Sequence, residues 1–295
     1  MTIETPPDWQ AALQSILDRN VRHVLVLGAP DAGKSTFCGI LLAHAVAASR
    51  KAALLDADPG QKQVGPPACV TLGHLGTGGR PVLSALVFLG TIEPLRCWPR
   101  LLAGAASLAA EARADLVVIN TCGLLRGPGR RLKAAIISAM RPDLLVTIGE
   151  DRNAETILAD HPGIPALRLP RSALARRKGE GERRTLRRAA FRNYFEQAPC
   201  WPLLTNRIHL ESGDGEALPP PGRLVALADK AGRDLVLGLV MGQAPSGHLL
   251  LKAPQPDRVV AGLRWGRLGL DEAWAEQWAT FAQPGPPTRH QSGQA

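Results

Sequence analysis

The sequence predicts an α/β fold in which a parallel sheet is covered by helices on both faces. Three observations support this prediction. Short apolar runs alternate with helix-like segments along residues 23–160. These runs are continuous rather than interrupted by polar residues, which is typical of strands buried on both faces. In addition, 45% of the 295 residues are hydrophobic, which suffices for a large core.

The predicted elements follow one another in a regular order. A helix over residues 8–18 comes first, with apolar side chains at helical spacing. Five strands are predicted over residues 23–27, 52–55, 82–89, 115–119 and 144–148. Helices are predicted over residues 34–48, 95–112, 130–140 and 154–160. Sheets of this kind bind ligands at the carboxyl ends of their strands, so functional residues are expected there.

The chain after residue 169 has a different character. Residues 170–198 predict a long arginine-rich helix or a pair of helices. Short strand-like runs joined by Gly, Pro and Asp turns then predict a small, mostly-β module over residues 199–282, with a terminal amphipathic helix over residues 271–281. Residues 283–295 are rich in Pro, Gly and Gln and are expected to be disordered. The predicted units are thus an N-terminal helix (1–20), a core (21–169), the arginine-rich helices, the β module and the tail.

The clearest functional motif is a phosphate-binding P-loop. Residues 28–36 match the pattern G-x-x-x-x-G-K-[ST] without a mismatch, after a predicted strand and at the start of a predicted helix. Lys34 would reach the β- and γ-phosphates of a nucleotide, and Ser35 would coordinate Mg²⁺. We expect the whole loop to bind a nucleoside triphosphate, through Gly28, Ala29, Pro30, Asp31, Ala32, Gly33, Lys34, Ser35 and Thr36.

Two carboxylates follow the second predicted strand. Asp56 and Asp58 are two residues apart, so both side chains would point to the same face, towards the P-loop. One would help to hold Mg²⁺ through its waters, and the other would accept the proton of an attacking hydroxyl. Many P-loop proteins place an aspartate after a later strand, but here that strand ends in Asn120-Thr121-Cys122-Gly123. Metal and base duties are therefore expected of Asp56 and Asp58.

The strand over residues 144–148 is not followed by the guanine-reading pattern N-K-x-D. A GTPase is therefore disfavoured. The remaining classes are phosphoryl transfer to an acceptor and nucleotide-driven switching.

Charge is concentrated in one segment. The chain carries a net charge of +9 from 35 basic and 26 acidic residues. Between Arg168 and Arg192, ten basic residues stand against Glu180 and Glu182, so this segment alone carries +8. Such a localised excess indicates a polyanionic partner, although many charge runs are only solvated helix faces.

Other features exclude several classes. The apolar stretches are too short for a transmembrane span, and residues 1–10 lack the basic and apolar regions of a secretory signal. A cytoplasmic protein is expected. Its five cysteines are widely spaced and odd in number, which indicates neither a disulfide framework nor a zinc site.

Taken together, the motifs resemble the polynucleotide 5′-hydroxyl kinases of RNA processing, the group of the mRNA cleavage-factor and nucleolar ribosomal-RNA kinases. The resemblance rests on the P-loop, on Asp56 to Gln61 followed by Gly65-Pro66-Pro67, and on residues 120–124 with the later Gly127-Pro128-Gly129. It continues with RRTLRRAAFRNYF at residues 183–195 and with residues 237–240. Matching elements in the same order extend from about Trp9 to Leu270.

The resemblance implies an ATP- and Mg²⁺-dependent enzyme that transfers the γ-phosphate of ATP to the 5′-hydroxyl end of RNA or DNA. Asp58, directly before Pro59-Gly60-Gln61, would be the general base, and Asp56 would support the metal. The segment Thr121-Cys122-Gly123-Leu124 would form a clasp for the terminal nucleotide, where Leu124 replaces a residue that is often aromatic. Other acceptor contacts would come from Gln61, Arg126 and Arg187.

The arginine-rich helix resembles the lid of this family, in which an R-x-x-x-R pair closes over the triphosphate. The sequence offers two overlapping pairs, Arg183 with Arg187 and Arg184 with Arg188. The second pair is preferred as catalytic, together with Lys34 and Asp58. An inserted arginine is worth ~10³ to 10⁵ in the rate of phosphoryl transfer.

Two other functions remain open at this point. One is a non-catalytic ATP-binding scaffold of an RNA-processing complex, against which the two acids and the arginines argue. The other is a small-molecule P-loop kinase, which the +8 segment disfavours. Phe191, Tyr194 and Phe195 occupy helical spacing, and packing in the core is expected of them rather than stacking on bases.

Overall fold

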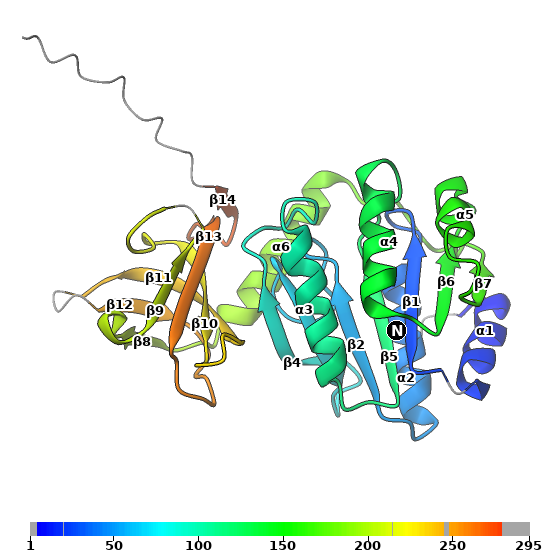
Figure 1. Cartoon of the computed structure of the whole chain (residues 1–295), viewed down its shortest axis with the longest axis horizontal. Coiled ribbons are helices and arrows are strands. Elements are labelled where there is room, and N and C mark those ends of the chain that lie inside the picture. The colour runs from blue at the N-terminus through cyan, green and yellow to red at the C-terminus, as the bar shows by residue number, and fades with distance from the viewer. Residues whose placement is uncertain (1–4, 20, 214, 245–247, 279–295) are drawn as a thin grey trace, which may run out of the picture.

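The computed structural model describes residues 5–19, 21–213, 215–244 and 248–278. These residues form an α/β part at the N-terminal side and a β module at the C-terminal side, with helix α6 (Glu180–Phe195) between them in sequence (Figure 1). The predicted disordered tail, 283–295, lies outside the described residues. Among the described residues, no helix has the length and apolar character needed to cross a membrane.

The first sheet has seven strands in the order β4-β3-β2-β5-β1-β6-β7. Its five parallel strands are β1 (His23–Gly28), β2 (Ala52–Ala57), β5 (Leu116–Thr121), β6 (Leu144–Ile148) and β7 (Ala166–Leu169). β3 (Cys69–Leu75) and β4 (Pro81–Phe88) form an antiparallel hairpin at one edge. The prediction of a buried parallel sheet is confirmed for the strands around β1.

The expectation that the strand over residues 82–89 is also parallel is wrong. It pairs antiparallel with β3, a strand that the sequence analysis missed. Only five residues, 76–80, connect β3 to β4, and a parallel connection would need a crossover of a dozen or more.

Helices cover both faces of this sheet, as predicted. One face packs on α1 (Pro7–Asp18) and α2 (Lys34–Ala47) through a cluster of buried side chains that includes Trp9 and Phe37. The other face packs on α3 (Trp98–Glu111), α4 (Pro128–Met140) and α5 (Arg152–Ala159). Helices α2 to α5 each follow a strand and begin after a loop at its carboxyl end, which leaves these loops free to form a site.

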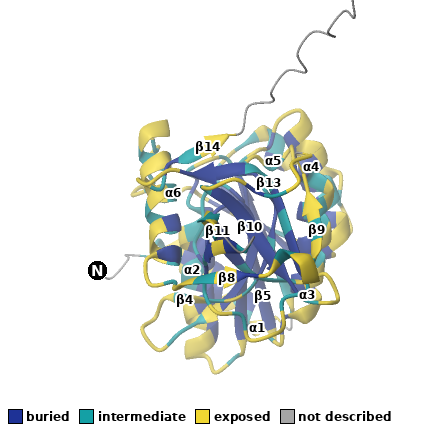
Figure 2. Cartoon of the chain, turned by 90° about the vertical axis from the view of Figure 1, so that its left-hand side faces the viewer, coloured by how far each residue is buried: buried dark blue, intermediate teal, exposed yellow. Residues whose placement is uncertain are grey.

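The C-terminal part is a small β module, as predicted. Its strand order is β14-β13-β10-β11-β12-β8, and β9 pairs with β13. In the view onto this module, β10 and the middle of β11 are buried and the surrounding loops are exposed (Figure 2). The strands are β8 (Cys200–Leu203), β9 (His209–Ser212), β10 (Arg223–Ala228), β11 (Asp234–Gln243), β12 (Leu249–Lys252), β13 (Gly262–Leu270) and β14 (Glu276–Trp278), with a short 3-10 helix η1 (Thr205–Arg207).

The predicted terminal helix over residues 271–281 is not found in its described part. Asp271 Oδ1 accepts hydrogen bonds from the backbone N–H groups of Ala273 and Ala275, at 2.9 and 2.8 Å, within a hairpin turn that joins β13 to β14. Trp274 in this turn has a φ of +63°, which an α-helix does not allow. Residues 276–278 then form β14. Trp274 stacks on Phe195 of α6, with ring centroids 5.8 Å apart.

The two parts share a hydrophobic core. Phe191 and Phe195 of α6 pack against Phe88 at the end of β4 and against apolar residues of β10, β11 and β13. The Tyr194 hydroxyl accepts a hydrogen bond of 2.9 Å from the backbone N–H of Leu237, and burial raises the pKa of this tyrosine. The expectation that these three aromatic residues pack in the core is confirmed.

Candidate functional site

The P-loop has the strand–loop–helix geometry that its motif predicts. β1 ends at Gly28 and α2 begins at Lys34. Gly33, the residue before the helix, has a φ of +107°, and a Cβ built there would lie 3.0 Å from the Trp9 ring. Only glycine fits this conformation at so close a contact. Trp9 itself is fixed by a 2.9 Å hydrogen bond from its Nε1 to the Pro170 carbonyl.

Lys34 is buried within the loop that it would serve. Its Nζ donates a 2.8 Å hydrogen bond to the carbonyl of Ala29. Burial, and then the nearby positive charge of Lys133, lower the pKa of Lys34 to about 8. An anion beside this ammonium group would therefore gain both a charge partner and a hydrogen-bond donor.

Asp58 is half-buried in the loop that follows β2. Its Oδ1 accepts hydrogen bonds from the backbone N–H groups of Gly60 and Gln61, at 2.9 and 3.1 Å. The Gln61 side chain donates to the Arg183 carbonyl at 3.4 Å and so connects this loop to α6. The carboxylate is thereby fixed in orientation beside the P-loop.

Asp56 differs from Asp58 in being fully buried. One oxygen, Oδ1, accepts from Asn120 Nδ2 at 3.1 Å and from the Asp58 backbone N–H at 3.2 Å. The other, Oδ2, accepts from the Gln63 backbone N–H at 2.7 Å and lies 3.6 Å from Lys62 Nζ. Burial raises the pKa of Asp56, and Lys62 opposes that rise. Asp56 thus orients the loop that carries Asp58.

Two amide side chains surround this acid and leave polar atoms unpaired. Gln63 donates through Nε2 to the carbonyl of Ser35. Gln63 Oε1 and Asn120 Oδ1 are buried, and neither has a hydrogen-bond partner in the described part of the chain. Buried polar atoms are nearly always satisfied, so these two oxygens fit a hydrated ion or water beside Ser35 and Asp56.

The predicted clasp packs directly against the P-loop. Thr121 Oγ1 donates a 2.9 Å hydrogen bond to the Val26 carbonyl of β1. A Cβ at Gly123 would lie 2.5 Å from the backbone nitrogen of Pro30, so no larger residue fits there without displacing the loop. Lys133, buried in α4, donates to the Cys122 carbonyl at 2.6 Å and holds the clasp from behind.

One cavity of about 450 Å³ brings many of these residues together. Of the predicted site residues, its lining includes much of the P-loop, Asp58, Gln61, Gly123, Leu124 and Arg187. Thr121 and Cys122 are buried beneath it. Asp56, Arg126, Arg184 and Arg188 are not among the lining residues.

The arginines of α6 that line the cavity are Arg183 and Arg187, rather than the preferred pair, and Arg176 before the helix also lines it. Arg183 Nη2 lies 2.5 Å from Oδ2 of Asp31 in the P-loop. The same oxygen accepts a 3.0 Å hydrogen bond from the backbone N–H of Lys178, which precedes α6. Arg187 pairs with Glu276 of β14, and both side chains are nearly buried, at 12% and 9% exposure.

Arg184 and Arg188 turn away from the cavity. Arg184 pairs with Glu180 one helical turn earlier and is 56% exposed. Arg188 faces the C-terminal module, where its charge lowers the pKa of Asp271 as the smallest of several causes, the largest being a backbone hydrogen bond from Ala275. Of the two overlapping pairs, the structure thus places Arg183 with Arg187 at the cavity, and not the pair preferred from the sequence.

Comparison with known proteins agrees with this geometry. The family model of the mRNA cleavage and polyadenylation factor CLP1 P-loop matches residues 28–197, which is more than half of the chain. The chain belongs to the CLP1 P-loop family. The match extends from the first glycine of the P-loop to the end of the lid helix.

Relatives in this family carry kinase names. A protein from Pyrococcus horikoshii named polyribonucleotide 5′-hydroxyl-kinase is 30% identical over 214 residues, which cover 70% of this chain and 59% of that protein. The Clp1 polyribonucleotide 5′-hydroxyl-kinase of Danio rerio is 31% identical over 190 residues, 59% of this chain and 43% of that protein. The chain thus matches about three fifths or less of the length of these relatives.

A solved structure shows the same fold. Clp1p in its complex with Pcf11p aligns over 86% of this chain and 76% of that chain, with a TM-score of 0.67 and 13% sequence identity. The aligned share includes residues beyond the family match, so the likeness extends into the C-terminal module.

Several residues around the cavity and the buried Asp56 were missed by the sequence analysis. Gln63 and Lys62 stand within two residues of Gln61, and their side chains were not considered. The side chain of Asp31 was counted only as part of the loop, although it pairs with the lid. Nothing in the sequence indicated Glu276, because it lies in a segment predicted to be a helix far along the chain.

Proposed function

We propose that this protein is an ATP- and Mg²⁺-dependent polynucleotide kinase that transfers the γ-phosphate of ATP to the 5′-hydroxyl end of RNA or DNA. The observation that carries the proposal is the single cavity in which Lys34, Asp58 and two arginines of α6 meet. The names of the family relatives from Pyrococcus horikoshii and Danio rerio support it.

On the donor side, residues 28–36 bind the triphosphate. Backbone N–H groups of the loop and the N-terminus of α2 favour phosphate, and Lys34 adds a charge-assisted hydrogen bond. Mg²⁺ fits beside Ser35, with Asp56 acting through water, because unpaired oxygens of Gln63 and Asn120 lie around that carboxylate. The bound ion would neutralise charge on the transferred phosphoryl group.

On the acceptor side, Asp58 receives the proton of the 5′-hydroxyl. Its hydrogen bonds to described residues fall on Oδ1, which leaves Oδ2 for this proton. The hydroxyl oxygen bonds to the γ-phosphorus, the bond from that phosphorus to the β–γ bridging oxygen breaks, and ADP leaves. Gln61 and the clasp residues Thr121, Cys122, Gly123 and Leu124 hold the terminal nucleotide, and Arg126 lies beyond the clasp for a later phosphate.

The lid supplies positive charge to the transferred group. Arg183 and Arg187 line the cavity and are proposed to contact the phosphates, with Arg184 and Arg188 as the alternative pair. Phosphoryl transfer depends more on positioning and charge neutralisation than on covalent help, so these contacts have a large effect on rate. A closed lid also limits hydrolysis of ATP by water.

The exposed Leu124 at the clasp offers no aromatic surface for a terminal base. We therefore propose recognition of the backbone and the 5′ end rather than of base identity. The sequence-based expectation of a cytoplasmic location remains part of this proposal.

One assay tests the function. The protein is incubated with γ-labelled ATP and with oligonucleotides that carry either a 5′-hydroxyl or a 5′-phosphate, as RNA and as DNA. We expect label only on hydroxyl-ended strands and none with Lys34→Ala. Tight ATP binding without transfer to any strand would contradict the kinase and favour a scaffold, and transfer only to a small metabolite would favour a small-molecule kinase.

A further inference from the structure

A second cavity, separate from the catalytic one, lies between the two parts of the molecule. It occupies about 400 Å³ between the carboxyl end of β4 and strand β13. At its floor the two parts touch through glycines, since a Cβ on Gly266 would lie 3.2 Å from the Gly90 carbonyl. We call this cavity the arginine groove; its lining is Phe88, Leu89, Gly90, Thr91, Arg96, Arg100, Glu211, Ser212, Gly213, Arg264, Trp265, Gly266, Arg267 and Trp278.

Arginine is the commonest charged residue in the lining of the groove, and nearby acids pair with three of these arginines: Arg96 with Glu93, Arg100 with Asp234, and Arg264 with Asp234 and Glu211. Its lining contains four arginines against one acid, Glu211. None of the four belongs to the basic segment that the sequence analysis identified, so this charge is not part of the lid. Clustered arginines on one surface are typical of sites for polyanions.

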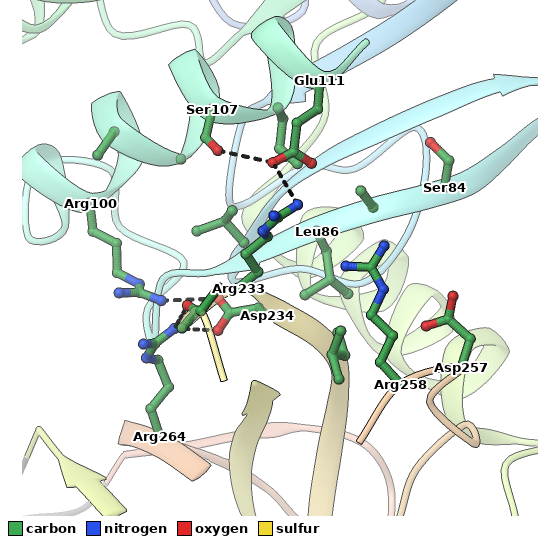
Figure 3. Close-up of a pocket in the computed structure, with 18 residues that line it drawn as sticks. Ser84, Leu86, Arg100, Ser107, Glu111, Arg233, Asp234, Asp257, Arg258 and Arg264 are labelled. Atoms are coloured by element: carbon green, nitrogen blue, oxygen red, sulfur yellow. Dashed lines mark hydrogen bonds and ion pairs between the residues drawn. The ribbon is translucent and has the colours of Figure 1, made fainter. Parts of the chain in front are cut away.

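Two of these arginines are held in place from the neighbouring cavity. Figure 3 shows that cavity, in which the Asp234 carboxylate lies between the guanidinium groups of Arg100 and Arg264. Asp234 Oδ2 also accepts a 2.7 Å hydrogen bond from the Phe88 backbone N–H. A buried acid thus fixes two cations from opposite parts of the molecule, at the inner end of the groove.

Two other residues of the lining offer accessible charge and an aromatic surface. Arg96 is 68% exposed and pairs with Glu93, also exposed, at 2.7 Å. Trp278 is 40% exposed, although large aromatic side chains are usually buried more fully. Arginines and an exposed indole that line the same groove can bind single-stranded nucleic acid, through phosphates and stacked bases.

The groove continues from the acceptor side of the catalytic cavity. One short segment, residues 89–96, borders both: Ile92, Glu93 and Pro94 line the catalytic cavity, whereas residues 89–91 and Arg96 line the groove. A Cβ on Gly60, two residues after Asp58, would lie 3.4 Å from the Ile92 carbonyl. A strand whose 5′ end lies at Asp58 can therefore leave the cavity past this segment.

We propose that the arginine groove binds the phosphodiester backbone of the acceptor strand, downstream of the nucleotide that is phosphorylated. This proposal rests on the proposed function and adds a binding site to it. The groove gives the C-terminal module a direct part in binding the substrate, since β9, β13 and β14 supply one wall. Because phosphate contacts carry no base information, this site favours longer strands without selecting a sequence.

The test compares long and short acceptor strands in the Arg96→Gln/Arg267→Gln double variant. We expect kcat/KM for a long single strand to fall about tenfold or more, because charged hydrogen bonds to phosphate are lost. The value for the shortest 5′-hydroxyl strand that the wild type phosphorylates should not change. For the long strand, the slope of log affinity against log salt should become shallower by about 1.4, at roughly 0.7 per lost contact.

Controls separate binding from folding. Arg80→Gln removes an exposed arginine at the opposite end of the β3–β4 hairpin and should leave both strands unaffected. Arg96→Lys/Arg267→Lys keeps the charge and should restore most of the preference for length, and Trp278→Ala should weaken only the long strand. An equal loss of kcat/KM on short and long strands, or no loss on long strands, would contradict the proposed role of the groove.

The groove and the catalytic function can fail separately. If the wild type phosphorylates no strand, the kinase proposal fails, and the groove is tested by the fluorescence anisotropy of a labelled single strand. Binding that is lost in Arg96→Gln/Arg267→Gln and kept in Arg80→Gln supports the groove. Equal binding by both variants contradicts it.

Discussion

The donor half and the acceptor half of the catalytic cavity are built in different ways. The donor half is a single contiguous loop between β1 and α2, whose glycines and backbone N–H groups do most of the binding. The acceptor half is assembled from side chains of the β2 loop, the clasp, α6 and β14. A contiguous backbone site is visible in the sequence as a motif, whereas a site made of distant side chains depends on how the elements pack.

The largest expected effect concerns the lid, where the two halves meet. We predict that Arg183→Ala and Arg187→Ala each lower kcat by ~10³ or more, because these side chains line the cavity. Arg184→Ala and Arg188→Ala, on the other side of the same helix, should stay within about tenfold of wild type. Steady-state kinetics on a 5′-hydroxyl strand measure all four. A greater loss of kcat with Arg184→Ala than with Arg183→Ala would contradict this assignment and favour Arg184 with Arg188 as the catalytic pair.

The next effect tests whether the C-terminal module supports the acceptor half. Glu276→Gln leaves the nearly buried Arg187 without its charge partner. Breaking such a pair costs about 3 kcal/mol of unfolding free energy, and kcat should fall with it because Arg187 loses its orientation. Urea unfolding and kinetics measure the two effects.

Glu180→Gln is the matched control for Glu276→Gln. It removes the partner of Arg184 in an exposed pair within one helix, which is worth only a few tenths of a kcal/mol. Equal effects of the two substitutions would show that the module does not position the lid.

Contact between the clasp and the P-loop gives a smaller effect. Gly123→Ala would place a methyl group 2.5 Å from the Pro30 nitrogen, and such overpacking costs about 1–3 kcal/mol. We expect weaker ATP binding together with lower stability, measured by calorimetry and thermal unfolding. Gly127→Ala is a useful comparison, because its Cβ meets no atom within 4 Å, although its φ of +52° adds some strain.

The smallest effect is the pH dependence of ATP binding. In the free protein the pKa of Lys34 is about 8, and triphosphate beside the ammonium group raises it. Binding above about pH 8 therefore takes up a proton, and ATP affinity falls by at most about tenfold per pH unit. Calorimetry in buffers with different ionisation enthalpies measures this uptake. Affinity that rises with pH would contradict the depressed pKa.

The lowered pKa of Lys34 also makes the free energy of unfolding depend on pH. Unfolded Lys34 titrates near 10.5, so between about pH 8 and 10.5 the unfolded state binds more protons than the folded state. The contribution of Lys34 to the free energy of unfolding therefore rises with pH in that window.

Features formed by contiguous residues were predicted from the sequence better than features that depend on how distant segments pack. The central parallel strands were found because their apolar runs are continuous. β3 was missed because its sequence, CVTLGHL, mixes polar and apolar residues after a loop rich in Gly and Pro. The terminal helix was wrongly predicted because Trp274 and Trp278 are spaced as on a helix, whereas this segment turns back at Trp274 and pairs with β13.

The sequence did not predict which lid pair lines the cavity, for a related reason. Arg183 with Arg187 and Arg184 with Arg188 have the same spacing, so the sequence pattern does not distinguish them. The rotation of α6 is set by Phe191 and Phe195, which pack at the junction of the two parts. Arg183 and Arg187, in the first half of α6, line the cavity, whereas Phe191 and Phe195, in its second half, pack in the core. The spacing of apolar residues along the helix therefore does not predict which arginines line the cavity.

The central claim is that Asp58 accepts the proton of the 5′-hydroxyl as that hydroxyl attacks the γ-phosphorus of ATP. Asp58→Asn tests this claim most directly. ATP affinity and single-turnover transfer to a 5′-hydroxyl strand are measured in the variant and in the wild type. We predict equal or tighter ATP binding, because a negative charge near the triphosphate is removed, with transfer slowed by ~10² to 10⁴. Transfer within a few-fold of wild type, or a parallel loss of ATP affinity, would contradict the assignment of Asp58 as the base of a polynucleotide kinase.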